Sequence, residues 1–190
     1  MYETILSPVN YGGLTLKNRI IFAPTSMGLP REQWMARLRA IAAGGCAMII
    51  LGDIPVGKHG FGPSLYTPKG RAFYQELARM VHGEGCMLCA QLHQSDSNLK
   101  AMLKYVPGIL SKKISMEQLR PLLNEEVGPY ITGLSEKKVR EITSSFGAAA
   151  GLAKEAGFDI VQVHGDRMCG SFSSVLYNHR QDAYGGSVEN

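Results

Sequence analysis

Several protein classes are excluded by what this sequence lacks. It has no apolar run near the roughly 20 residues that cross a bilayer. The first ten residues, MYETILSPVN, include an acidic residue and no apolar run, so we expect no secretory signal. Only four cysteines are present, in or beside apolar runs, which favours a reducing compartment over a disulfide scaffold. We therefore expect a cytoplasmic protein that does not enter a membrane.

The chain also has little excess charge of either sign. The formal net charge of +4 is small and spread along the chain, which argues against a nucleic-acid-binding surface. The basic clusters Lys112-Lys113 and 137–140 are interpreted as solvated faces. With 190 residues, 45% of them hydrophobic and 19% charged, the chain is long enough for one globular domain with a core.

Short apolar segments alternate with amphipathic ones. A glycine turn at Tyr11–Leu14 predicts an N-terminal hairpin. The predicted strands cover residues 20–23, 47–51, 86–92 and 160–163, and the predicted helices cover 32–43, 70–82 and 135–156. Residues 52–63 are expected to form a loop, and the proline-containing stretch 95–132 an irregular excursion with short helical pieces.

Apolar strands linked by helices predict a parallel α/β sheet. Two architectures then compete, an open doubly wound sheet and an eight-stranded (β/α)8 barrel. The open sheet normally carries a glycine-rich phosphate-binding turn after its first strand. Here that strand is followed by Pro24-Thr25-Ser26-Met27, so the barrel is the better interpretation.

The segment after the strand at 160–163 carries the strongest chemical signal. His164, Arg167 and Cys169 follow the buried strand directly, where barrel enzymes place catalytic groups. His164 could donate a hydrogen bond to a developing oxyanion, or be a loop histidine bonded to backbone. Arg167 could bind an anion or pair with Asp166 or Asp182, and Cys169 could donate a proton or be a small buried apolar residue.

Two further polar residues follow earlier strands. Gln91 offers an amide suited to the edge of a heterocycle, with a structural hydrogen bond as the equal alternative. Ser26 is favoured as a turn or capping hydroxyl on pattern alone. Cys86 and Cys89 have CxxC spacing, but alternation within a strand points them to opposite faces, so we expect no metal site.

The chain resembles the old yellow enzyme family, flavin oxidoreductases with an FMN-binding (β/α)8 barrel. The resemblance covers nearly the whole sequence. It rests on LSPVNYGGLTLKNRIIFAP, GG-CAMIIL, AQL, AAAGLAKEAGFDIVQVHG and above all NHRQDAYGGSVEN.

This resemblance implies specific roles. Residues 23–26 (Ala23, Pro24, Thr25, Ser26), Asp53 and Gln91 would line FMN, and His164 would polarise the substrate carbonyl. NAD(P)H would reduce FMN, and hydride would pass to an activated alkene conjugated to a carbonyl, as in an enone or enoyl substrate. Desaturation in the reverse direction would use the same residues.

Three positions depart from the family pattern. Arg167 replaces the usual histidine or asparagine partner of His164, which would favour an anionic or strongly polarised carbonyl. Cys169 replaces the usual proton-donating tyrosine; a thiol, with a pKa of about 8.5 against about 10, can still donate a proton. The third-strand signature QL-x-H-x-G-R reads QLHQSDSN. The HGDR form also resembles longer enzymes with an iron–sulfur cluster.

The length of the chain limits how much of a barrel it can form. A full barrel needs about 250 residues and eight strands, and this sequence supplies four strands. Residues 1–190 are therefore expected to be the N-terminal half of an FMN-binding barrel, with the C-terminal half and any iron–sulfur cluster absent. Two open sheet edges would favour a homo-oligomer or the missing half as partner. A fragment without activity is the rival hypothesis.

Overall fold

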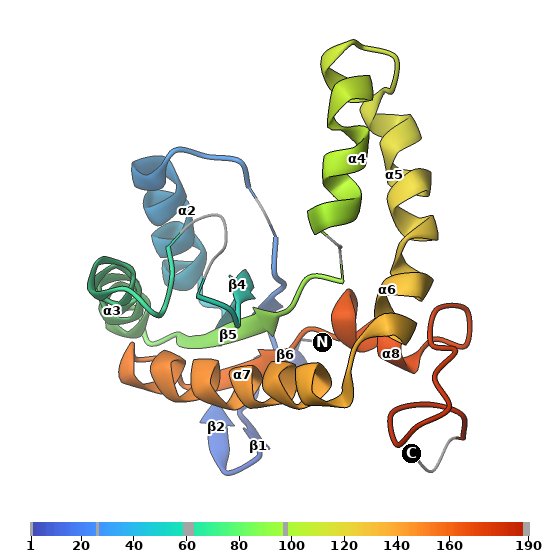
Figure 1. The fold of residues 1–190 in the computed structure, drawn as a ribbon. Coiled ribbons are helices and arrows are strands. Elements are labelled where there is room, and N and C mark those ends of the chain that lie inside the picture. The colour runs from blue at the N-terminus through green and yellow to red at the C-terminus, as the bar shows by residue number, and fades with distance from the viewer. Residues whose placement is uncertain (1, 26, 59–62, 97–98, 188–190) are drawn as a thin grey trace. The chain divides into compact units, whose positions relative to one another are not determined.

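The computed structural model of the protein describes residues 2–25, 27–58, 63–96 and 99–187 (Figure 1). The chain forms two compact units. We call Met1–His93 with Ser145–Val163 the sheet unit, and Gln94–Ser144 with His164–Asn190 the helical unit. Each unit is described by itself.

The sheet unit begins with the short helix α1 and the predicted hairpin, whose strands pair antiparallel. Gly12 and Gly13 form its turn with φ of +55° and +86°, a backbone region that glycine adopts without strain. The elements of this unit are α1 (Glu3–Leu6), β1 (Val9–Tyr11), β2 (Leu14–Leu16), β3 (Ile21–Phe22), α2 (Arg31–Ala43), β4 (Met48–Pro55), α3 (Pro68–Gly83), β5 (Met87–His93), the C-terminal part of α7 (Glu136–Glu155) and β6 (Ile160–Val163).

The main sheet decides between the two predicted architectures. Its four parallel strands lie in the order β3-β4-β5-β6, so each strand pairs with the next one in the chain. An open doubly wound sheet reverses direction at a switch point, whereas a barrel adds strands in one direction. The order therefore confirms a partial (β/α)8 barrel.

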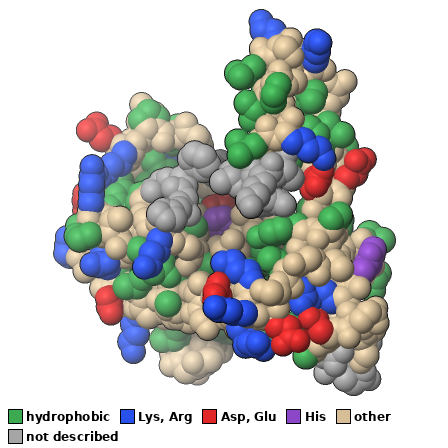
Figure 2. Space-filling view, in the orientation of Figure 1, with side chains coloured by type: hydrophobic (Ala, Val, Ile, Leu, Met, Phe, Trp, Pro, Cys, Tyr) green, Lys and Arg blue, Asp and Glu red, His purple; other side chains and the backbone are tan. Residues whose placement is uncertain are grey.

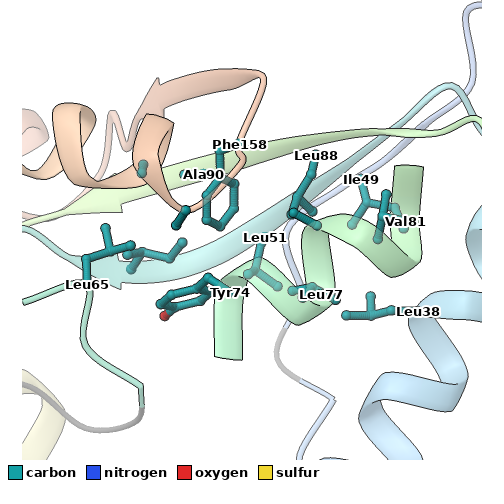
Figure 3. Close-up of a cluster of buried hydrophobic side chains, with 14 of the residues drawn as sticks. Leu38, Ile49, Leu51, Leu65, Tyr74, Leu77, Val81, Leu88, Ala90 and Phe158 are labelled. Carbon is teal, nitrogen blue, oxygen red and sulfur yellow. The ribbon is translucent and has the colours of Figure 1, made fainter. Parts of the chain in front are cut away.

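Helices α2, α3 and the C-terminal part of α7 cover one face of this sheet. The core between them contains Leu38, Ile49, Leu77 and Leu88, all at most 2% exposed (Figure 3). Small side chains let α7 lie close to the strands: Ala149 and Ala153 of the helix, and Ala156 directly after it, are fully buried. Burial of this apolar surface holds the strands in place.

In the described part of the sheet unit, the hairpin covers part of the opposite face of the sheet. Leu16 of the hairpin packs with Ala47, Met48 and Cys89, at the N-terminal ends of β4 and β5. The same arrangement confirms that Cys86 and Cys89 face opposite sides, since Cys86 belongs to the helix-covered core. The C-terminal ends of these strands are outside this apolar cluster.

The helical unit contains α4 (Leu99–Leu110), α5 (Met116–Glu125), α6 (Val127–Gly133), the N-terminal part of α7 and α8 (Met168–Ser173). Helices α4 and α5 form an antiparallel hairpin (Figure 1). Ser115 starts α5 with a capping box: its hydroxyl accepts from the Gln118 amide nitrogen at 3.2 Å, and the Gln118 side chain accepts from the Ser115 nitrogen at 2.9 Å.

One expectation about these elements was wrong. Residues 52–55, expected in a loop, continue β4, because a bulge between Leu51 and Ile54 restores pairing with β5. The excursion 95–132 contains the expected short helical pieces, which are α4, α5 and α6 and include Pro107, Pro121 and Pro129. The polar segment after β6 contains the short helix α8.

The described residues contain no helix long and apolar enough to span a bilayer. Basic and acidic side chains are intermingled on the face that Figure 2 shows. This distribution agrees with the small net charge.

Candidate functional site

The face of β5 opposite the covering helices changes from apolar to polar along the strand. Because side chains alternate, Met87, Cys89, Gln91 and His93 share one face. Met87 and Cys89 pack in the cluster below the hairpin, whereas Gln91 and His93 continue the face at the C-terminal end. This is the end of a parallel barrel at which enzymes place their reaction sites.

Gln91 connects two strands at this end. It is 7% exposed, and its Nε2 donates to Oε1 of Gln162 on β6 at 2.8 Å. The two residues are also direct register partners. Because Gln162 occupies Nε2, the orientation of the Gln91 amide is fixed, and its Oε1 points toward β4.

Gly52 leaves space beside that amide. A Cβ at this position would lie 2.9 Å from Cβ of Pro24 and 3.5 Å from Oε1 of Gln91. Any larger residue would push the segment after β3 away from β4. We call Gly52, Gln91, His93 and Gln162 the polar face; with Pro24 beside it, it is built from three neighbouring strands and the segment after a fourth.

The other predicted cofactor residues are placed unevenly. Thr25 Oγ1 donates to the carbonyl of Ala23 at 3.4 Å, a local turn contact. Asp53 is exposed at the β4 bulge with φ of +57°, so its backbone rather than its carboxylate is the constrained feature. Ser26 lies outside the described residues. Pro24 and Gln91 are brought together; their cofactor roles remain predictions.

His93 has an unusual hydrogen-bonding state. Its Nδ1 is buried and has no hydrogen-bond partner among the described residues. Sequence reasoning gave no role to His93, Gly52 or Gln162. Alternation along β5 was the available signal for His93, whereas Gly52 and Gln162 depend on cross-strand register.

The three predicted catalytic residues lie at the start of the segment His164–Asn190 of the helical unit. His164 is half-buried, and Arg167 is exposed at the N-cap of α8 with φ of +57°, a strained conformation outside glycine. Cys169 is half-buried in α8, and burial raises the pKa of its thiol. A thiol shifted in this direction keeps its proton at neutral pH, as a proton donor must.

Helix α8 is anchored by the segment that departs from the family signature. The Met168 nitrogen donates to the carbonyl of Gln94 at 3.2 Å, and Ser171 Oγ donates to Oδ2 of Asp96 at 2.7 Å. Ser171 is only 4% exposed. The residues that replace H-x-G-R therefore hold the helix that carries Cys169.

We call the motif NHRQDAYGGS a structural lock, because its polar side chains bind the backbone of α8 and of the end of α6. Arg180 is 5% exposed and donates to the carbonyls of Ile131 at 3.0 Å and Leu134 at 2.5 Å, at the C-terminus of α6. Its guanidinium also binds Asp182 and holds the pKa of that carboxyl below its ordinary value. A Cβ at Gly185 would lie 2.8 Å from Arg180, so only glycine fits there.

Asn178 completes this lock. Its Nδ2 donates to the carbonyls of Phe172 at 2.8 Å and Tyr184 at 2.7 Å. The most specific motif in the sequence thus joins α6, α8 and its own turn through buried polar contacts. Asp182, one of two partners considered for Arg167, is bound by Arg180.

In the described part of the chain, no group of three His, Cys, Asp or Glu side chains could hold a metal ion. Cys46, Cys86 and Cys89 are buried free thiols, and Sγ of Cys46 lies 3.4 Å from Sγ of Cys86. Burial raises the pKa of Cys86 to about 12 and that of Cys89 to about 11.

Comparison with known proteins decides the family. The sequence model of the NADH:flavin oxidoreductase / NADH oxidase family matches residues 4–190. The chain belongs to this family. Within it, the chain is 56% identical over 191 residues to a bilirubin reductase of Clostridium symbiosum, covering all of this chain and 51% of that relative. It is 33% identical to a bilirubin reductase of Mediterraneibacter gnavus, covering 98% and 29%.

Solved structures agree on the fold. An old yellow enzyme of Pichia superposes with a TM-score of 0.74 at 23% identity, covering 98% of this chain and 53% of that one. The chain thus spans about half or less of the length of the relatives named here.

Gln91 and Gly52 of the polar face fit the flavin of such an enzyme. A planar heterocycle with amide groups at its edge needs a fixed amide partner and close approach of backbone. Gln91 supplies the amide, and the missing side chain at Gly52 supplies the space. The roles that the resemblance implies for His164 and Ser26 stay predictions, since His164 belongs to the helical unit and Ser26 lies outside the described residues.

Proposed function

We propose that this chain is the N-terminal half of an FMN-dependent NAD(P)H oxidoreductase that reduces an activated alkene conjugated to a carbonyl. The observation that carries the proposal is the polar face: a buried, oriented amide beside a glycine gap at the C-terminal end of a parallel sheet. Family membership gives the redox class. Bilirubin is the first acceptor to test, because both named relatives are bilirubin reductases.

The chain's residues have distinct roles in this proposal. Gln91, Pro24 and the backbone around Gly52 hold one edge of FMN, together with Ala23, Thr25, Ser26 and Asp53. Bound FMN would supply hydride transfer from NAD(P)H to the acceptor. His164 donates a hydrogen bond to the acceptor carbonyl and stabilises the negative charge that develops there.

Arg167 and Cys169 complete the acceptor side. Arg167 adds permanent positive charge near the carbonyl end, which favours an anionic or strongly polarised acceptor. Cys169 keeps its proton because burial raises its pKa, and gives that proton to the alkene carbon. Desaturation in the reverse direction would use the same groups with the proton moving back to the cysteine.

Flavin binding is tested first. We expect the purified chain to bind FMN measurably in equilibrium dialysis, and Gly52→Ala to weaken binding about tenfold, because its Cβ collides with Pro24. The matched control is Gly151→Ala in α7, where a Cβ meets nothing within 4 Å. Absence of FMN binding by the wild-type chain would contradict the proposal and favour an inactive fragment.

Acceptor chemistry is tested second, with NADH or NADPH, FMN and bilirubin. We expect His164→Ala to lower acceptor reduction at least a hundredfold while FMN affinity stays unchanged. Loss of flavin together with activity would contradict the carbonyl-polarising role. If the wild-type chain binds FMN but turns over no acceptor alone, addition of the C-terminal half of a relative should restore turnover; failure to do so would contradict the half-barrel proposal.

A further inference from the structure

Nδ1 of His93 lacks a hydrogen-bond partner among the described residues, and the proposed flavin contacts do not supply one. It is the single buried side-chain nitrogen or oxygen without a partner among the residues that the structure describes. Buried polar atoms are nearly always bonded, so each exception needs a reason. His93 ends β5 on the polar face, in line with Gln91.

The buried side of the ring determines where its proton sits. If the neutral ring carried its proton on Nδ1, an N–H donor would be buried without an acceptor, which is unfavourable. With the proton on Nε2, Nδ1 holds only a lone pair. The His93 side chain is only half-buried, and Nε2 is not among the buried unpartnered atoms. The burial pattern therefore selects the tautomer that offers an Nε2–H donor on the open side.

The position of His93 separates it from the cofactor contacts. Two residues of strand place its Cα roughly 7 Å beyond Gln91 toward the C-terminal end of β5. If Gln91 holds the edge of the flavin, His93 stands one layer further out. A molecule stacked on the flavin would lie at that level.

We propose that His93 is a binding residue for the electron acceptor, with its Nε2–H donating to a carboxylate or carbonyl oxygen of a planar conjugated molecule. The proposal rests on the proposed function. It adds a donor from the sheet unit that is independent of His164. It also gives the unusual QLHQ sequence a role in selecting acceptors with an anionic oxygen.

The tautomer is tested by nitrogen-15 and carbon-13 NMR of histidine side chains, with benzoate as the probe. We expect the His93 ring of the purified chain to show the Nε2–H pattern, and the Nε2 resonance to shift on addition of benzoate. His93→Phe assigns the signals. An Nδ1–H ring, or a His93 ring that ignores saturating benzoate, would overturn the proposal.

Substitutions that mimic one nitrogen each test the contact itself. The amide nitrogen of His93→Gln stands near the place of Nε2, whereas that of His93→Asn stands near Nδ1. We expect the benzoate Kd to rise at least tenfold in His93→Asn and His93→Phe, and to stay within about threefold in His93→Gln. His179→Phe, at an exposed position of the helical unit, should leave the Kd unchanged. Equal Kd values in all variants would refute the contact.

FMN affinity is measured in the same samples. Variants of His93 should retain FMN within about threefold, because the residue is assigned to the acceptor. If the chain binds FMN but not benzoate, this inference fails and the proposed function stands. If it binds no FMN, the proposed function and this inference fail together, which the FMN measurement distinguishes from failure of this inference alone.

Discussion

Removal of the Arg180 side chain tests whether the NHRQDAYGGS motif is a structural lock. Arg180→Leu keeps most of the apolar stem but deletes the guanidinium that binds the carbonyls of Ile131 and Leu134 and the carboxylate of Asp182. Arg180 is 5% exposed, so water cannot readily replace it. The change leaves several polar groups without their partner.

The magnitude follows from these contacts. A hydrogen bond to a charged group contributes about 1.5–3 kcal/mol, and Arg180 makes such bonds to the carbonyls of Ile131 and Leu134. The contacts share one side chain and some freed groups regain water, so the values do not add. We expect the free energy of unfolding of the helical unit to fall by about 4 kcal/mol, which lowers the urea midpoint by about 2 M.

The assay separates the two units. Far-UV circular dichroism follows the loss of helix with urea, and amide hydrogen exchange of residues 127–134 reports on α6. The single tryptophan, Trp34, stacks on Phe73 at 5.7 Å in the sheet unit, so its fluorescence follows that unit. We expect faster exchange in α6 while the tryptophan transition moves less.

Arg120→Leu is the matched control, because Arg120 is exposed on α5 of the same unit. A surface change of this kind alters stability by about 0.5 kcal/mol or less. If Arg180→Leu and Arg120→Leu differ by less than about 1 kcal/mol, the structural reading of the motif is wrong. The motif would then serve something other than the stability of the fold.

Two predictions concern titrating groups. Burial raises the pKa of Tyr74 from 10.0 to about 12. The neutral hydroxyl therefore contributes fully to the free energy of unfolding below pH 10, and this contribution is lost as the pH rises toward 12. We expect the free energy of unfolding, measured by urea titration, to fall by about 2–3 kcal/mol over this range. Tyr74→Phe should reduce this loss and exposed Tyr11→Phe should not; an unchanged pH slope in Tyr74→Phe would oppose the reasoning. With iodoacetamide at neutral pH, mass spectrometry should find Cys169 labelled first and Cys86 and Cys89 only after unfolding, because deep burial holds their pKa values near 12 and 11; labelling of Cys86 at the rate of Cys169 would contradict this.

Some residues of the candidate site could be predicted from the sequence, whereas others depend on pairing between strands. Gln91 was singled out because it lies at the end of a predicted strand and its amide suits the edge of a heterocycle, and the structure shows it buried and oriented. Gln162, which orients it, lies 71 residues away, and no local pattern connects the two. Gly52 was assigned to a loop because a glycine after a strand usually ends it; the bulge that continues β4 depends on pairing with β5.

Local periodicity by itself determined the hairpin, the alternation of strands and helices, β6 and the limits of α2 and α7 to within about two residues, since these follow from short-range alternation and helix capping. The family motif determined the redox class. Only the tertiary structure decided the strand order, the polar face, the unpartnered nitrogen of His93 and the buried anchor of Arg180. These depend on which residues distant in sequence pack together, and that is set by burial and cross-strand pairing over the whole chain.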